Sequence, residues 1–247
     1  MMRYLVLLAA VASMGADQRK PGSDFMGEST RVMQRDDSQN PAMLWVGDGE
    51  ALWRDKVNGK SCAGCHSDAA TSMKGVAARF PAFDPHGKKP VNLAQRINQC
   101  RVAKQDAAPF KLESKELLGL ESYLALQSRG MPVNPPQDKR LKPFTASGEK
   151  LFFQRMGQLN LSCAQCHDDN AGNRLASSPI PQGHANAYPI YRLEWQAVGS
   201  LQRRLRNCMS GVRADAPPYG ALELVELELY LAARAKGMTI ESPGVRP

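Results

Sequence analysis

The sequence predicts an all-α fold of two similar domains that arose by internal duplication. The pentapeptide Cys-x-x-Cys-His occurs twice among the 247 residues, beginning at Cys62 and at Cys163. Similar segments precede and follow both copies in the same order, and the following segments have apolar residues at helical spacing. Long alternating runs of apolar and polar residues, which would indicate strands, are absent from the sequence.

Each copy is expected to begin with a helix that lies before the pentapeptide. Residues 48–53 match residues 147–152, and each segment starts with a good N-capping residue, Asp48 or Ser147. A glutamate follows in the first turn of both segments, where its negative charge favours the helix dipole.

Each copy is expected to end with a second helix. Residues 116–124 match residues 223–231, and in both segments leucines recur at three- and four-residue spacing on one helix face. Both segments then reach a Gly-Met pair, at Gly130 and Gly237, where the glycine is a plausible C-terminal cap. The proline-rich, polar stretch 133–140 is therefore expected to link the two copies.

The pentapeptide is typical of covalent haem c attachment, in which two thiols add to the haem vinyl groups and the histidine ligates iron. A structural zinc site is the alternative, but it needs two further ligands near each pair, and none follows at short spacing. A dithiol redox motif would not explain the histidine in both copies. We therefore expect two covalently bound haem c groups. The predicted attachment residues and histidine ligands are Cys62, Cys65 and His66 in the first copy and Cys163, Cys166 and His167 in the second.

Residues 1–16 have the features of a secretory signal peptide. Arg3 precedes an apolar run from Tyr4 to about Ala12, and small residues follow. A membrane anchor is the alternative, but the run is far shorter than the ~20 residues that a spanning helix needs. Because haem c is attached outside the cytoplasm, we expect a periplasmic protein with no membrane span.

The rest of the sequence divides into three parts. Residues 17–43 form a polar N-terminal extension for which no element is predicted, residues 44–134 form the first domain, and residues 141–247 form the second. The formal net charge of +8 suits an anionic small substrate or an acidic protein partner. Export argues against nucleic acid as the partner.

Two further cysteines, Cys100 and Cys208, lie between a haem motif and the final helix of their copy. The residues alone leave three alternatives open. The two cysteines form a disulfide, or they are free thiols while methionines such as Met131 and Met238 ligate iron, or each is a thiolate ligand to its own iron.

An arginine stands four residues before each of these cysteines, at Arg96 and Arg204, and so lies on the same helix face as the thiol. Several arginines surround Cys208, where they would lower the pKa of the thiol and bind an anion. A solvated helix face is the alternative explanation of such a run. The denser cluster favours Cys208 over Cys100 as the reactive cysteine.

The order of helix, haem motif, irregular stretch and final helix resembles the class I cytochrome c fold in each half. Two haem motifs, each followed by a cysteine in an Arg-x-x-x-Cys setting, make the chain similar to the dihaem A subunits of the Sox sulfur-oxidising cytochrome complex. The most specific stretch is 202–209, and 189–193 and 216–220 are also similar.

The resemblance implies that iron is ligated by His66 with Cys100 and by His167 with Cys208. It further implies that Cys208 is the catalytic residue, carried as a persulfide, and that Arg204 binds substrate.

The resemblance also implies an activity and partners. With a small monohaem cytochrome c subunit in a heterodimer, such a chain is an L-cysteine S-thiosulfotransferase. It couples thiosulfate oxidatively to a cysteine of a sulfur-carrier protein and passes two electrons to cytochrome c. The residues leave three alternative functions open. The first is a dihaem periplasmic electron-transfer cytochrome without a substrate site, and the second is a dihaem peroxidase. The third is an anion-binding or structural subunit whose chemistry lies in its partner.

Overall fold

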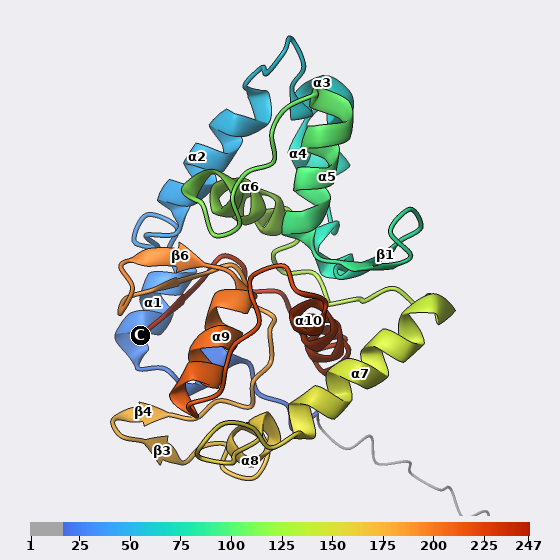
Figure 1. Cartoon of the computed structure of the whole chain (residues 1–247). Coiled ribbons are helices and arrows are strands. Elements are labelled where there is room, and N and C mark those ends of the chain that lie inside the picture. Colours follow the sequence, from blue (N-terminus) through green and yellow to red (C-terminus); the bar gives the residue numbers. More distant parts are fainter. Residues whose placement is uncertain (1–16) are drawn as a thin grey trace, which may run out of the picture.

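Each half of the chain is built on two crossing helices. In the computed structural model, which describes residues 17–247, α2 (Met43–Arg54) packs on α6 (Lys115–Leu126). In the second half α7 (Lys142–Phe153), preceded by the short η3 (Lys139–Leu141), packs on α10 (Leu222–Arg234) in the same way. Figure 1 shows the first pair above the second. The expected signal peptide lies outside the described residues.

Glycines allow the two helices of each pair to approach closely. A side-chain Cβ at Gly49 would lie 2.0 Å from the carbonyl oxygen of Gly119, and one at Gly148 would lie 2.0 Å from that of Glu226. Real atoms do not approach so closely, so the backbones touch where only glycine fits. Below each crossing lies a separate apolar core, which contains Trp53 in the first half and Phe152 in the second.

The haem motifs form short helices, α3 (Cys62–His66) and α8 (Cys163–His167). Serines cap both, because Ser61 accepts a hydrogen bond from the Gly64 amide and Ser162 accepts one from the Gln165 amide. The lone cysteines lie on the helices that follow, α5 (Leu93–Gln105) and α9 (Leu201–Gly211). The first half also contains α4 (Ala69–Ser72) and η2 (Ala77–Arg79).

The prediction of an all-α fold is wrong in one respect, because residues 17–247, although mostly helical, also contain three small sheets. Antiparallel hairpins precede α5 and α9, and they pair β1 (Ala82–Asp84) with β2 (Lys89–Val91) and β5 (Ile190–Arg192) with β6 (Ala197–Gly199). The strand β7 (Gly244–Arg246) adds to β5 in parallel, and β3 (Arg174–Leu175) pairs with β4 (Ser178–Pro179). Strands of two or three residues are too short to produce an alternating sequence pattern.

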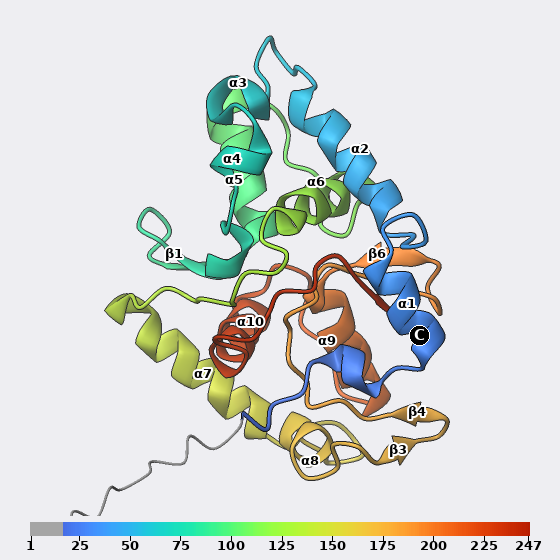
Figure 2. The same ribbon diagram turned by 180° about the vertical axis from the view of Figure 1, so that it is seen from behind.

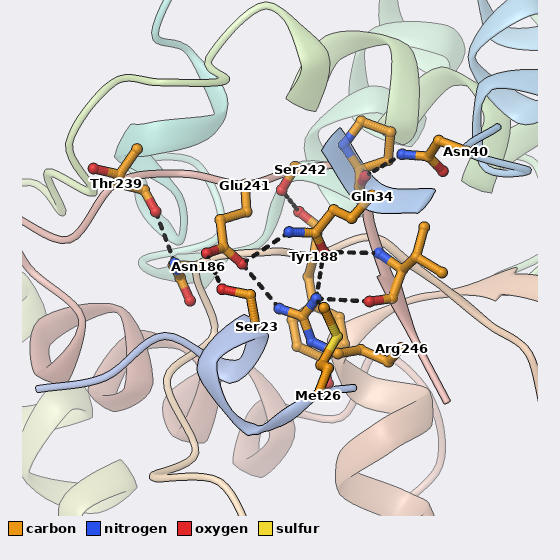
Figure 3. A network of polar contacts seen from close by, with 12 residues as sticks. Ser23, Met26, Gln34, Asn40, Asn186, Tyr188, Thr239, Glu241, Ser242 and Arg246 are labelled. Atoms are coloured by element: carbon orange, nitrogen blue, oxygen red, sulfur yellow. Dashed lines mark hydrogen bonds and ion pairs between the residues drawn. The ribbon is translucent and has the colours of Figure 1, made fainter. Parts of the chain in front are cut away.

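The N-terminal extension packs on the C-terminal end of the chain. It contains η1 (Gly22–Phe25) and α1 (Glu28–Arg35), and α1 lies beside β7 and the C-terminus (Figure 2). Figure 3 shows the polar contacts that hold it. The Ser23 hydroxyl donates to the Glu241 carboxylate at 2.6 Å, and the Val245 amide donates to Gln34 Oε1 at 3.0 Å. The extension is therefore part of the second half's structure.

The segments that follow α6 and α10 pair with each other between the two halves. The Val133 amide donates to the Met238 carbonyl and the Ile240 amide donates to the Met131 carbonyl, both at 2.9 Å. Met238 is buried with Ala235 and Ile240 in a small apolar cluster of its own. Met131 and Met238 thus lie at the interface between the halves, apart from the cores that contain the motif cysteines, which disfavours them as iron ligands.

Buried carboxyl groups face a cavity of about 120 Å³ between the halves. Glu121 and Glu228 occupy the same position on α6 and α10, and Glu113 lies nearby. Burial, together with the charges of Glu228 and Glu113, raises the pKa of Glu121 to about 8. Burial likewise raises the pKa of Glu228 to about 7, although Asn92 donates a hydrogen bond to it at 3.0 Å.

Replacement of Glu228 by glutamine is expected to stabilise the protein at about pH 9, by on the order of 2–3 kcal/mol, and to change little at about pH 5. Between an ordinary pKa of 4.5 and the folded value of about 7, the folded protein holds a proton that the unfolded chain has lost. The free energy of unfolding therefore falls as the pH rises through this window. Urea denaturation of the haem-loaded protein at both pH values measures the effect. Glu223→Gln, which removes an exposed carboxylate from the same helix, is the control, and equal pH dependence in the two variants would contradict the expectation.

Candidate functional site

The second haem motif holds its histidine in a defined orientation. His167 Nδ1 lies 2.7 Å from the carbonyl oxygen of Pro181, which can only accept, so Nδ1 carries the proton. The remaining nitrogen, Nε2, is therefore the one that meets the Cys208 thiol of α9, with which the ring makes a hydrogen bond. Figure 1 shows α8 beneath α9. The structure thus brings together two residues that the sequence separates by 41 positions.

The thiol of Cys208 has an environment that favours the thiolate. Burial alone would raise its pKa, but the hydrogen bond with His167 and the charge of Arg204 outweigh burial, and the pKa lies below its ordinary value. By contrast, burial and the nearby Cys208 sulfur raise the pKa of Cys163 to about 11 and also raise that of Cys166.

This donor set fits a haem c group. Two thiols on one turn of α8 would hold the group covalently. The oriented imidazole of His167 and the thiol of Cys208 would be the residues that ligate its iron, and the iron would supply a redox centre. Among residues 17–247, no group of three or more histidine, cysteine or acidic side chains is arranged to hold another metal ion.

Of the arginines near Cys208 in the sequence, Arg204 is the one whose charge lowers the pKa of this thiol. Arg203 stacks on the Trp195 ring, 4.4 Å from its centre, and Arg206 donates to the carbonyls of Ala216 and Pro217. Arg203 and Arg206 are therefore engaged in contacts with other parts of the fold. Of these three arginines, Arg204 is the one that acts on Cys208.

A second arginine, Arg192 at the end of β5, also acts on Cys208 and was missed from the sequence. Its charge lowers the pKa of the thiol, after those of Arg204 and His167. Burial and the charge of Arg204 in turn lower the pKa of Arg192 itself. Tyr188 lies partly buried beside them, and desolvation of its phenol raises its pKa to about 12. The family resemblance covers 189–193 but assigns no role to Arg192.

The first haem motif makes a more open site. Cys65, His66 and Cys100 are exposed, whereas Cys166, His167 and Cys208 are partly buried. The His66 ring lies against Trp53, with 5.7 Å between the ring centres. Cys100 lies close enough to Cys62 to contribute, after burial, to the raised pKa of that thiol. The structure therefore turns α5 towards α3, as it turns α9 towards α8.

The arginine of the first site is neutralised. Arg96 lies 4.0 Å from the carboxylate of Asp84, whose side chain is only 5% exposed. Arg101, the next arginine, lies over the Phe110 ring and donates to the Ala108 carbonyl. The first half thus places a buried carboxylate beside its arginine, whereas the second half places a further cation, Arg192, beside Arg204. All six cysteines are free thiols, so the alternative of a Cys100–Cys208 disulfide is not realised.

Comparison with known proteins gives the chain a family. The model of the SoxA/TsdA cytochrome c domain matches twice, at residues 48–133 and 147–240. The chain belongs to the SoxA/TsdA cytochrome c family. Membership implies covalently bound haem c, which is the cofactor that a Cys-x-x-Cys-His motif attaches.

Two relatives in the SoxA/TsdA family cover most of the chain. One is the L-cysteine S-thiosulfotransferase subunit SoxA of Pseudaminobacter salicylatoxidans, which is 39% identical over 93% of this chain and 82% of that protein. The other is the subunit of the same name from Paracoccus pantotrophus, which is 37% identical over 91% and 78%.

The crystal structure of SoxXA from P. pantotrophus has the same fold. It matches with a TM-score of 0.89 and 36% identity, covering 93% of this chain and 87% of that one. Within the described residues, no helix has both the length and the apolar character needed to cross a membrane.

Proposed function

We propose that this chain is the haem-bearing A subunit of an L-cysteine S-thiosulfotransferase, with its active site at Cys208. The observation that carries the proposal is the meeting of Cys208, His167 and Arg204 in a partly buried site. The matching residues of the first half are exposed and Arg96 is neutralised. The names of the two relatives give the reaction class.

The proposed reaction joins thiosulfate to a carrier cysteine and releases two electrons and one proton. In the first half-reaction, the Cys208 thiolate and the terminal sulfur of thiosulfate form an S–S bond as two electrons leave for cytochrome c. In the second, the carrier thiolate attacks the sulfane sulfur and Cys208 departs as a thiolate. The proton comes from the carrier thiol. A bound haem c supplies the redox centre beside this sulfur through which the electrons leave.

The residues around Cys208 have separate tasks in this reaction. Arg204 binds the sulfonate end of thiosulfate by charge-assisted hydrogen bonds and orients the terminal sulfur towards Cys208. The backbone carbonyl of Pro181 fixes the His167 ring, so that Nε2 stays directed at the cysteine side. The pKa of Cys208, which His167 and Arg204 hold below its ordinary value, favours the thiolate, which is the nucleophilic form.

We also propose two haem c groups, with axial pairs His66–Cys100 and His167–Cys208. Attachment would be at Cys62 and Cys65 and at Cys163 and Cys166 in two class I cytochrome c domains, which cover 44–134 and 141–247 and arose by duplication. The repeated element order and the double family match support this.

The partner is proposed to be a monohaem cytochrome c subunit, because the matching crystal structure is of the SoxXA complex. The substrate cysteine would be supplied by a separate sulfur-carrier protein. Export to the periplasm and removal of residues 1–16 complete the proposal.

Arg204→Ala tests the substrate site. Loss of the guanidinium is expected to lower kcat/KM for thiosulfate by about 10²-fold, because a charge-assisted contact to the dianion disappears. Haem content should remain that of the wild type, since Arg204 makes no attachment. Turnover of the reconstituted complex, with cytochrome c as acceptor, measures the effect. Unchanged kinetics would favour an electron-transfer cytochrome without a substrate site.

A further inference from the structure

The two halves contain one matched stretch in which the hairpin and the cysteine-bearing helix correspond residue by residue. In the first hairpin Asp84 pairs with Lys89, and in the second Arg192 pairs with Ala197. Each turn carries one non-glycine residue at positive φ, Lys88 at 53° and Gln196 at 49°. The spacing from hairpin to cysteine is the same in both halves, so Asp84 corresponds to Arg192.

At this one position the two halves carry opposite charges. In the first half Asp84 lies against Arg96, the arginine four residues before Cys100, and neutralises it. In the second half the same place beside Arg204 is taken by a cation, Arg192. At this position the first half therefore has the ion pair Arg96–Asp84, whereas the second half has two like charges, Arg204 and Arg192.

Two partly buried arginines with like charge repel each other unless an anion lies between them. Arg192 is only 14% exposed, so solvent does little to screen this repulsion. Its polar partners are the carboxylate of Glu194 at 2.8 Å, itself 63% exposed, and the carbonyl of Pro247 at 3.0 Å. Its guanidinium also lies over the Trp195 ring, 5.2 Å from the ring centre. An ion pair with so exposed a carboxylate contributes little and is readily replaced.

We infer that Arg192 is a second anion-binding residue of the Cys208 site, which together with Arg204 matches the two negative charges of thiosulfate. The inference rests on the proposed function for the identity of the anion. The opposite charge at Asp84 would disfavour such an anion in the first half, which has its own arginine and cysteine.

The test is thiosulfate binding to the haem-loaded complex, measured by calorimetry without carrier protein or electron acceptor. Arg192→Gln is expected to raise the Kd about 10- to 100-fold, as for loss of one charged hydrogen bond, while Arg192→Lys restores most of the affinity. Arg213→Gln is the control. It removes the same charge from an exposed residue just after the C-terminal end of α9 and should leave the Kd unchanged. A wild-type Kd in Arg192→Gln would overturn the inference.

A surface variant keeps the test decisive if Arg192→Gln fails to fold. Glu194→Gln removes the carboxylate that competes for Arg192, so the Kd for thiosulfate is expected to fall about two- to fivefold. An unchanged Kd in Glu194→Gln would count against Arg192. If the wild-type complex binds thiosulfate with this dependence on Arg192 but does not couple it to a carrier cysteine, the proposed function fails and the anion site stands. If it couples thiosulfate and both variants bind it as the wild type does, only the inference fails.

Discussion

Cys208→Ala is expected to abolish the coupling of thiosulfate to a carrier cysteine, by about 10³-fold or more, while both haem groups stay attached. In the proposed reaction Cys208 provides the sulfur that forms the covalent intermediate, whereas the proposed attachment is at Cys163 and Cys166. Turnover of the complex with cytochrome c measures the loss, and the mass of the haem-loaded chain verifies attachment.

The duplication supplies a matched control in Cys100→Ala. Cys100 has the same place on α5 as Cys208 has on α9, but it lies in the exposed site whose arginine is neutralised. This variant is expected to change the ferric near-infrared and electron paramagnetic resonance spectra of one haem and to keep most of the activity. Full activity in Cys208→Ala would assign the chemistry to the partner subunit. Loss of activity in Cys100→Ala alone would mean that the roles of the two halves are reversed.

The sequence predicts most of the site because the decisive residues lie in short local patterns. A covalent haem motif consists of five consecutive residues, and Arg204 and Cys208 are one helical turn apart. Such patterns depend on covalent chemistry and helix geometry, so no knowledge of long-range packing is needed to find them.

Other features depend on packing that the sequence does not display. The contact of Gln34 with Val245 joins opposite ends of the chain, and the hairpins have strands of only three residues. Arg192 gives no repeat signal for a different reason. A repeat is recognised through matching residues, whereas Asp84 and Arg192 occupy equivalent positions with opposite charges. Their equivalence follows only from the equal spacing of both hairpins to Cys100 and Cys208.

Because α2 and α6 touch where they cross, replacing two glycines of α2 by alanine is expected to change the free energy of unfolding in opposite directions. Gly49→Ala is expected to lower the free energy of unfolding by about 3 kcal/mol or more, because its Cβ would lie 2.0 Å from the Gly119 carbonyl oxygen and 2.4 Å from the carbonyl carbon. Both obstacles are backbone atoms, so relief requires α2 to move away from α6. Denaturation of the haem-loaded protein by urea measures the change.

Gly47→Ala is the matched control, two residues earlier on α2. No atom lies within 4 Å of a Cβ at this exposed position, so the variant is expected to gain up to about 1 kcal/mol from the higher helix propensity of alanine. A loss of similar size in both variants would mean that α2 tolerates no side chain there for reasons other than the crossing. Opposite signs would locate the constraint at the contact with Gly119. Because a Cβ at Gly148 would lie at the same 2.0 Å from the Glu226 carbonyl oxygen, that result would make backbone contact the common basis of both halves.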